Sequence, residues 1–289
     1  MARRRNPVVQ AITTTSTLLF IRLSGILPLS LNRRLALLTG RVLGRLVPRV
    51  RQVALENLDR AYGDSLTTAE KETICRGAVD NIALVAAEFS HILRMPGGEL
   101  GTRVHVLGYE NVDPDQGYLC IGAHLGNWEL AGPFMAQKGL KVAEVVRPFD
   151  DPRMDRAIDR VRSSCNVVTI PKDNAGKEII QRLKDGYKVG VLIDPCWATI
   201  APVMIAVRAK VPILPLSVTR NEDYSYNLRF YPPIEMERTK DLRGDLVRNS
   251  QRCQDVIESI VRAYPTQWLW LHRRWKERPR LMEEWNKKV

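Results

Sequence analysis

The 289-residue sequence lacks the short motifs of several large enzyme classes. Its five cysteines are scattered and none form a C-x2-C pair, so the sequence predicts neither a zinc site nor a disulfide framework. The four histidines do not have metal-ligand spacing, and there is neither a P-loop nor a G-x-G-x-x-G motif. We therefore expect no metal ion and no nucleotide cofactor.

Acidic residues are missing from residues 1–55, which contain ten arginines. Residues 8–31 are mostly apolar, but Arg22 and Pro28 interrupt them and disfavour a helix that crosses a bilayer. Residues 33–52 continue with leucine and valine between arginines. This pattern is typical of helices that lie in the surface of an anionic membrane, and we expect such helices over residues 1–55. A buried helix with a basic flank is the alternative.

The formal net charge of +12 indicates an anionic partner, which is either a membrane or a nucleic acid. The concentration of arginine within a partly apolar segment favours the membrane. Residues 268–276 interleave tryptophan with basic residues, a composition that suits RNA bases and phosphates. The same composition suits a membrane interface or a clamp for an anionic substrate. Composition alone leaves these alternatives open.

From residue 56 onward, apolar runs of strand length alternate with amphipathic segments of helix length. Strands are predicted at 104–107, 117–121, 141–146, 167–170, 189–193 and 213–218, and helices at 67–89, 128–138, 152–163, 177–184 and 242–263. This alternation predicts an α/β fold with a largely parallel sheet flanked by helices. We find no internal repeat or flexible linker, so residues 56–289 are predicted to form a single domain.

His124 stands between the predicted strand at 117–121 and the helix that starts at Trp128. Ligands bind at the carboxyl ends of strands in open α/β sheets, so His124 is placed to meet a substrate. A tight turn would bring Glu129 to it, and a carboxylate on one imidazole nitrogen fixes the tautomer. We predict that His124 is a general base and Glu129 its orienting partner. By itself the spacing is a weak signal, since most such pairs are structural.

Two further residues follow predicted strands directly and should lie at the same sheet edge. Arg147 is expected to bind a phosphate or support an oxyanion, although a strand-end salt bridge is the alternative. Asp194 is expected to orient the acceptor or shape the pocket, with a turn cap as the alternative. Asn127, in the turn after His124, is also predicted to bind substrate.

The segment at 120–129 resembles the H-x4-D/E motif of membrane glycerolipid acyltransferases, in particular the lipid A late acyltransferase family of lauroyl and myristoyl transferases. The resemblance extends from about residue 33 to 278, and its most specific part is 265–276. It implies transfer of a fatty acyl group from an acyl carrier protein or coenzyme A thioester to a hydroxyl of a lipid A precursor. It also implies a site on the cytoplasmic face of the inner membrane, anionic-substrate contacts from Arg273 and Arg274, and no nucleic-acid partner.

The sequence departs from this family after Asp194, where relatives have a longer pocket-lining loop. Here residues 195–202 lead almost at once into another apolar run. The acyl-chain length and the acceptor therefore stay open, and another glycolipid such as a phosphatidylinositol mannoside is an alternative acceptor. A basic membrane-binding or RNA-binding protein without catalysis is the alternative from a different class.

Overall fold

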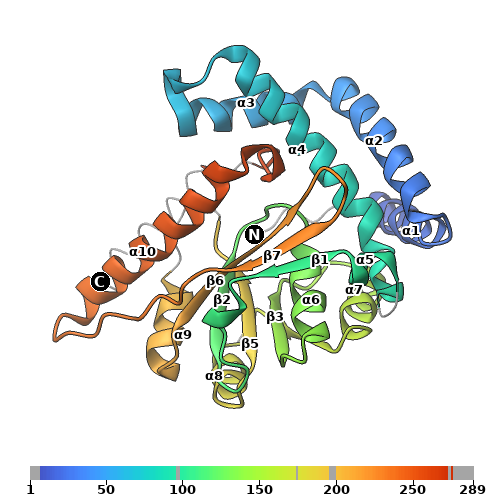
Figure 1. Cartoon of the computed structure of the whole chain (residues 1–289). Helices are drawn as coiled ribbons and strands as arrows, with labels where there is room; N and C mark the ends of the chain where they lie inside the picture. Colours follow the sequence, from blue (N-terminus) through green and yellow to red (C-terminus); the bar gives the residue numbers. More distant parts are fainter. Residues whose placement is uncertain (1–6, 96–97, 174, 195–199, 273–274, 276–289) are drawn as a thin grey trace.

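The computed structural model describes residues 7–95, 98–173, 175–194, 200–272 and 275, and their side chains from residue 10 onward. A seven-stranded sheet forms its centre, and helices cover both faces of that sheet (Figure 1). The strands are β1 (Val104–Leu107), β2 (Tyr118–Gly122), β3 (Val142–Val146), β4 (Val167–Pro171), β5 (Lys188–Leu192), β6 (Ile213–Arg220) and β7 (Tyr226–Phe230). Their order across the sheet is β1-β7-β6-β2-β5-β3-β4.

The sheet is mostly parallel, as the sequence predicts. Strands β6, β2, β5, β3 and β4 run in one direction, and β7 pairs with β6 in the opposite direction. Strand β1 lies at one edge and pairs with β7 in parallel. Strand β7 was not predicted from the sequence, while β1 is an edge strand as expected and His105 on it is exposed.

Strand β2 is buried over its whole length because helices cover both of its faces. Leu119 and Ile121 face one apolar core, and Tyr118 and Cys120 face the other, following the two-residue period of a strand. The helices are α1 (Pro7–Ser24), α2 (Leu29–Leu46), α3 (Pro48–Tyr62), α4 (Thr68–Phe89), α5 (Glu99–Thr102), α6 (Ala131–Gln137), α7 (Pro152–Ser163), α8 (Gly176–Lys184), α9 (Ala201–Ala209) and α10 (Leu242–Ala263). Helices α8, α9 and α10 cover one face, while α6 and α7 cover the other.

Helix α4 begins with the capping box that its sequence predicts. The Thr67 hydroxyl accepts a hydrogen bond from the Glu70 amide, and the Glu70 carboxylate accepts one from the Thr67 amide. This helix crosses above the sheet and connects the N-terminal helices to it (Figure 1). Helix α2 packs along α4, and α1 packs against both α4 and α7.

The outer surface of α1, α2 and the residues that follow each helix carries many apolar side chains between its arginines. Large side chains that are at least 43% exposed are Ile12, Leu19, Phe20, Leu23, Ile26, Leu31, Leu35, Leu38, Val42, Leu43, Leu46 and Val47. Among the described helices, none combines the length and the apolar composition needed to cross a bilayer. The predicted attachment of these helices to a membrane, and the predicted boundary at residue 55, stay predictions.

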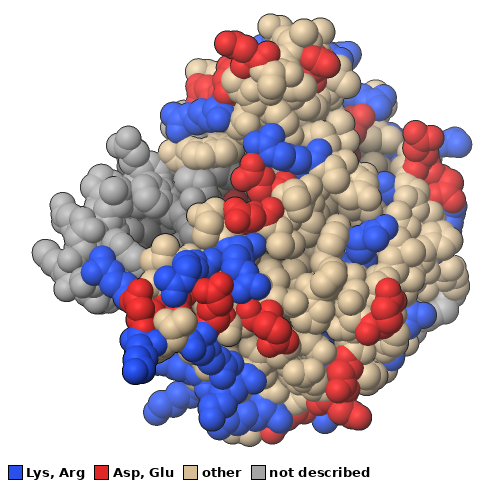
Figure 2. All heavy atoms as spheres, turned by 60° about the vertical axis from the view of Figure 1, so that its left-hand side comes forward, with Lys and Arg blue, Asp and Glu red and all other residues tan. Residues whose placement is uncertain are grey.

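The face that carries α10 contrasts with this apolar surface. On it, Lys and Arg side chains gather in one region and are interspersed with Asp and Glu (Figure 2). Within α10 the pairing is direct, since Arg248 contacts Asp245 and Arg262 contacts Glu258. Positive charge on this face is therefore partly neutralised within one helix, whereas arginines of residues 1–55 can pair only with acidic residues of later segments, as Arg41 does with Asp80.

Candidate active site

His124 lies two residues beyond the end of β2, where its imidazole contacts the buried carboxylate of Asp194. The Nδ1 atom of His124 is 2.8 Å from Oδ1 of Asp194, and the His124 amide donates to Oδ2 at 3.0 Å. The Asp194 side chain is 1% exposed and that of His124 is 31% exposed. The carboxylate accepts a hydrogen bond from the Nδ1–H group, so Nε2 is the nitrogen that can take a proton.

Asp194 comes from the residues after β5, and this strand pairs with β2. Its Oδ2 atom also accepts a hydrogen bond from the indole of Trp268, at 2.8 Å. Trp268 is buried, and its ring packs edge-on against that of Trp270 at 4.4 Å between centroids. Both indoles belong to the wall behind the site, so this part of the 268–276 segment is not a free surface for an interface or a clamp.

The backbone that carries His124 is held from two sides. The His124 carbonyl accepts a hydrogen bond from the Leu269 amide at 3.0 Å, and the Gly126 amide donates to the Gln267 carbonyl at 2.9 Å. Gly126 has φ +59°, and a Cβ there would lie 1.8 Å from the Val218 carbonyl oxygen. Only glycine fits this close approach.

Glu129 faces the same cavity as His124 but pairs with Arg162 of α7. The Arg162 guanidinium donates to both Glu129 oxygens, at 3.2 and 3.0 Å, and lies 3.3 Å from the Glu144 carboxylate. Among the described residues, no hydrogen bond or ion pair joins Glu129 to His124. The predicted contact between these two side chains is therefore not made, because Glu129 turns to Arg162 while Asp194 occupies the position beside the imidazole.

Glu144 is a carboxyl group whose charge depends on pH near neutrality. Burial raises its pKa to about 7, and the charge of Glu129 adds to this rise, while Arg162 opposes it. Arg162 thus lies between two carboxylates, and its own pKa is raised by both although burial lowers it. This cluster of Glu129, Arg162 and Glu144 was not predicted from the sequence, apart from Glu129 itself.

A cavity of about 220 Å³ opens between His124 and this cluster. Arg147 follows β3 directly and lines the cavity with His124 and Glu129, so the three residues lie at one sheet edge as predicted. Within the described residues Arg147 makes no hydrogen bond or ion pair. Its guanidinium is exposed and free to meet an anion. Phe149, which is 48% exposed, lines the same cavity.

Asn127 is fully buried and points away from solvent, toward Glu88 of α4. Its amide nitrogen donates to Oε2 of Glu88 at 2.8 Å, and its backbone amide donates to the Val218 carbonyl at 3.0 Å. The predicted substrate contact of Asn127 is untested, but its observed partners give it a role in holding the turn. Arg273 and Arg274, the other predicted substrate contacts, lie outside the described residues.

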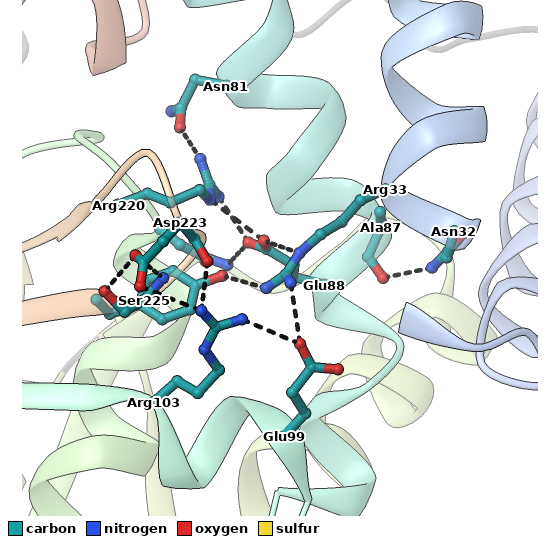
Figure 3. Close-up of polar contacts among 12 residues, drawn as sticks. Asn32, Arg33, Asn81, Ala87, Glu88, Glu99, Arg103, Arg220, Asp223 and Ser225 are labelled. Atoms are coloured by element: carbon teal, nitrogen blue, oxygen red, sulfur yellow. Dashed lines mark hydrogen bonds and ion pairs between the residues drawn. The ribbon is translucent and has the colours of Figure 1, made fainter. Parts of the chain in front are cut away.

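Glu88 is the centre of a buried network that joins α2, α4, β6 and β7 (Figure 3). Arg33 of α2 donates to it at 2.9 Å, and Arg220 at the end of β6 donates at 2.6 and 3.2 Å. Arg33 also donates to the Tyr226 hydroxyl. Burial alone would raise the pKa of Glu88, but Arg220 and Arg33 lower it, so its carboxylate is held ionised.

The network reaches the His124 turn through Asn81 as well. Arg220 donates to Oδ1 of Asn81 at 2.6 Å, and Nδ2 of Asn81 donates to the carbonyls of Gly126 and Gln267, both at 2.9 Å. These charged groups therefore help to hold the backbone of the turn that carries His124, while Asp194 contacts the imidazole itself. Sequence patterns gave no signal for this, since Arg33 lies among arginines that all suit a membrane surface.

The fold and the site define an α/β enzyme scaffold in which a carboxylate-bound histidine at a sheet edge faces a charged cavity. The chain belongs to the bacterial lipid A biosynthesis acyltransferase family, whose model matches residues 7–277. This is a family of enzymes, and the predicted membership is confirmed.

Curated relatives cover most of the chain. It is 24% identical over 253 residues to the lipid A biosynthesis palmitoleoyltransferase of Escherichia coli (strain K12), covering 80% of both chains. It is 23% identical over 248 residues to the lipid A biosynthesis acyltransferase of Haemophilus influenzae, covering 78% of both. It is 20% identical over 242 residues to the phosphatidylinositol mannoside acyltransferase of Mycolicibacterium smegmatis, covering 76% of this chain and 77% of that relative.

Proposed function

We propose that the protein transfers a fatty acyl group from the thioester of an acyl carrier protein or coenzyme A to a hydroxyl of a phosphorylated glycolipid, most simply a lipid A precursor. The observation that carries this proposal is the His124 imidazole, oriented by Asp194 and exposed to a cavity that Arg147 also lines. Membership of an acyltransferase family indicates the class of reaction, and the residues that line the cavity suit this reaction.

In this mechanism Nε2 of His124 takes the proton of the acceptor hydroxyl as its oxygen attacks the thioester carbonyl. A carbon–oxygen bond forms, the carbon–sulfur bond breaks, and the proton passes from His124 to the leaving thiolate. Asp194 keeps the imidazole in the tautomer that accepts this proton and stabilises the imidazolium. The structure therefore supports Asp194, in place of Glu129, as the orienting carboxylate.

Arg147 and the cluster around Arg162 have substrate-side roles in this proposal. Arg147 lies free at the cavity, and a guanidinium binds phosphate or a developing oxyanion with two hydrogen bonds. Glu129 acts through Arg162, because it holds this guanidinium at the cavity wall. The reaction as proposed uses no metal ion and no cofactor other than the acyl-carrier co-substrate.

An apolar cavity beside the site fits the acyl chain. It has a volume of about 530 Å³ and lies among α1, α4 and α7. Phe149 lines both this cavity and the cavity at His124, so the two adjoin. A thioester carbonyl at His124 would thus have its chain directed toward the N-terminal helices.

The exposed apolar surface of α1 and α2 supports a location at the inner (cytoplasmic) membrane. Apolar side chains alternate there with arginines, and no acidic residue occurs before Glu56. We propose that this surface lies in the cytoplasmic leaflet, with its arginines at anionic headgroups. The acyl cavity would then open close to the membrane that holds the acceptor.

The direct test is acyl transfer by the purified chain from a radiolabelled acyl-carrier thioester to a lipid A precursor. We expect transfer by the natural chain and none above background by His124→Ala. His105→Ala is the matched control, since His105 is exposed on β1 away from the cavity. Full activity of His124→Ala would end the proposed mechanism.

A phosphatidylinositol mannoside is the second candidate acceptor, favoured by the relative from Mycolicibacterium smegmatis and by the short segment after Asp194. Mass spectrometry of lipids from cells with and without the gene separates the two candidates. The lipid that loses one acyl chain identifies the acceptor.

A further inference from the structure

A groove between α2 and α4 has one apolar half and one basic half. Six of the apolar residues that line the first half are Leu35, Ala36, Leu43, Val79, Ile82 and Ala83, and this half has a volume of about 590 Å³. The second half, of about 640 Å³, is lined by Arg41, Arg45, Arg51, Arg76, Glu72 and Asp80. We call the two halves together the α2–α4 groove.

The two halves are continuous. Gly44 of α2 and Val79 of α4 line both of them. A Cβ at position 44 would lie 3.3 Å from Cγ1 of Val79, so a larger side chain there would narrow the junction. Glycine therefore keeps the apolar half open to the basic half.

The basic half carries more positive than negative charge. Arg41 pairs with Asp80 at 2.7 Å, and Arg51 pairs with Glu72. Arg45 and Arg76 have no acidic partner within the described part of the chain, so two guanidinium charges in the groove are not neutralised. The nearest polar partner of Arg76 is the Thr73 hydroxyl, at 2.9 Å.

We propose that the α2–α4 groove binds one anionic phospholipid of the surrounding bilayer, with its phosphate at Arg45 and Arg76 and an acyl chain in the apolar half. Guanidinium groups bind phosphate through charge-assisted hydrogen bonds, and the apolar half removes hydrocarbon from water. A free phosphate would use only the basic half. Leu35 and Leu43, which line the groove, are also part of the exposed apolar surface of α2. A lipid can therefore enter the groove from a membrane that covers this surface.

This site is separate from the proposed reaction. Arg45 and Arg76 do not line the cavity at His124, and the phospholipid is neither acyl donor nor acceptor. Its role is to fix the α2–α4 pair at the membrane surface, since one bound molecule contacts both helices. The proposal therefore holds or fails independently of the acyl-transfer mechanism.

The test is native mass spectrometry of the full chain in a neutral detergent, titrated with phosphatidylglycerol or with phosphatidylcholine of the same acyl chains. We expect a one-to-one phosphatidylglycerol complex that survives at lipid concentrations where phosphatidylcholine does not bind. Arg45→Gln with Arg76→Gln should weaken it about tenfold or more, since each lost guanidinium removes charge-assisted hydrogen bonds. Arg208→Gln with Arg229→Gln removes the same charge from exposed positions on α9 and β7, outside the groove, and should leave binding unchanged.

A second pair of variants tests the apolar half. Ala36→Phe places a ring in the groove and should prevent binding, while Leu38→Phe, at a position 63% exposed and outside the groove, should not. His124→Ala should bind phosphatidylglycerol like the natural chain, which keeps this result distinct from loss of acyl transfer. The proposal would be overturned if phosphatidylcholine bound as well as phosphatidylglycerol, or if both pairs of arginine variants lost phosphatidylglycerol binding equally. Full displacement of phosphatidylglycerol by inorganic phosphate would also overturn it.

Discussion

The turn that carries His124 and the surface of α1 and α2 follow opposite rules of burial. Behind the turn, charged groups are buried: Glu88 is fully buried and Arg33 is 4% exposed. On α1 and α2, apolar groups are exposed, as in Leu38 and Leu46 at 63% and 70%. Burying charge and exposing hydrocarbon both cost free energy in water, so each arrangement indicates a constraint other than stability of the soluble fold.

This difference in burial reflects the separate requirements of the His124 turn and of the α1 and α2 surface. The turn that carries His124 has to be held in one conformation, and a buried charged network holds it because its hydrogen bonds have fixed directions. Asp194 then orients the imidazole itself. The outer helices need a surface that prefers a lipid environment, and no directional contact is required for that.

Asp194→Asn should have the largest effect, on catalysis. The variant keeps the shape of the side chain but offers an amide where His124 needs a carboxylate, so kcat should fall about 10³–10⁴-fold, as for the loss of the corresponding carboxylate in a serine-protease triad. Steady-state acyl transfer measures this, with folding checked by thermal denaturation. Asp173→Asn, at an exposed position two residues after β4, is the matched control. If kcat were unchanged in Asp194→Asn, a group other than Asp194 would have to orient the His124 imidazole.

Glu88→Ala should lower the free energy of unfolding by about 3–5 kcal/mol, because Arg33 and Arg220 would keep buried charges without their shared carboxylate. Chemical denaturation measures the change. Glu258→Ala breaks the exposed pair with Arg262 on α10 and should cost less than about 1 kcal/mol. If the two variants were equally stable, the network behind the turn would have no special role in holding it.

Glu144→Gln should remove a pH dependence of stability. The ionised form of Glu144 is disfavoured in the fold, so the free energy of unfolding falls as pH rises from its ordinary pKa of 4.5 to about 7 and then levels off. The free energy of unfolding of the natural chain, minus that of Glu144→Gln, should therefore fall between pH 4.5 and about 7 and be constant above pH 7. Denaturation at a series of pH values measures this, and Glu178→Gln on the exposed side of α8 should show no such change. A difference that stays constant across the whole range would contradict the raised pKa.

Replacing Leu19, Leu23 and Leu38 together by serine should have the smallest effect on folding, about 0.5 kcal/mol or less per site, because all three side chains are exposed. Binding to vesicles that contain phosphatidylglycerol should nevertheless weaken, since this surface is the proposed membrane contact. Co-sedimentation with vesicles measures it. Replacing the exposed Leu242 and Val247 of α10 by serine is not expected to change vesicle binding. Equal loss of vesicle binding in both variants would show that the two faces do not differ in membrane contact.

Local patterns predicted much of the fold. The helices α7 and α10 have the predicted bounds of 152–163 and 242–263, and the capping box of α4 is confirmed. Strand β7 was missed because Tyr226–Phe230 is short, alternates between buried and partly exposed residues, and follows β6 closely. Its strand character comes from pairing with β6 and with β1, and β1 lies far from it in the sequence.

The sequence predicted correctly that the candidate site lies at one edge of the sheet, but it did not predict which side chains contact one another there. His124, Arg147 and Glu129 line one cavity because the ends of neighbouring parallel strands meet at one sheet edge. Glu129 was chosen as the partner of His124 on sequence proximity, yet Asp194, 70 positions away, makes that contact. Proximity in sequence failed because the first turn after β2 directs Glu129 toward α7, where Arg162 offers a charge to pair with.

Local sequence patterns account for the α/β class, the placement of His124, Arg147 and Asp194 after strands, and the basic apolar character of residues 1–55. These follow from periodicity and composition, which act over a few residues. The tertiary structure alone decided that β5 lies beside β2, that Arg33 leaves the basic surface to meet Glu88, and that Arg45 and Arg76 share a groove with apolar side chains. Such contacts join distant segments, and strand order and helix packing fix them only when the whole chain has folded.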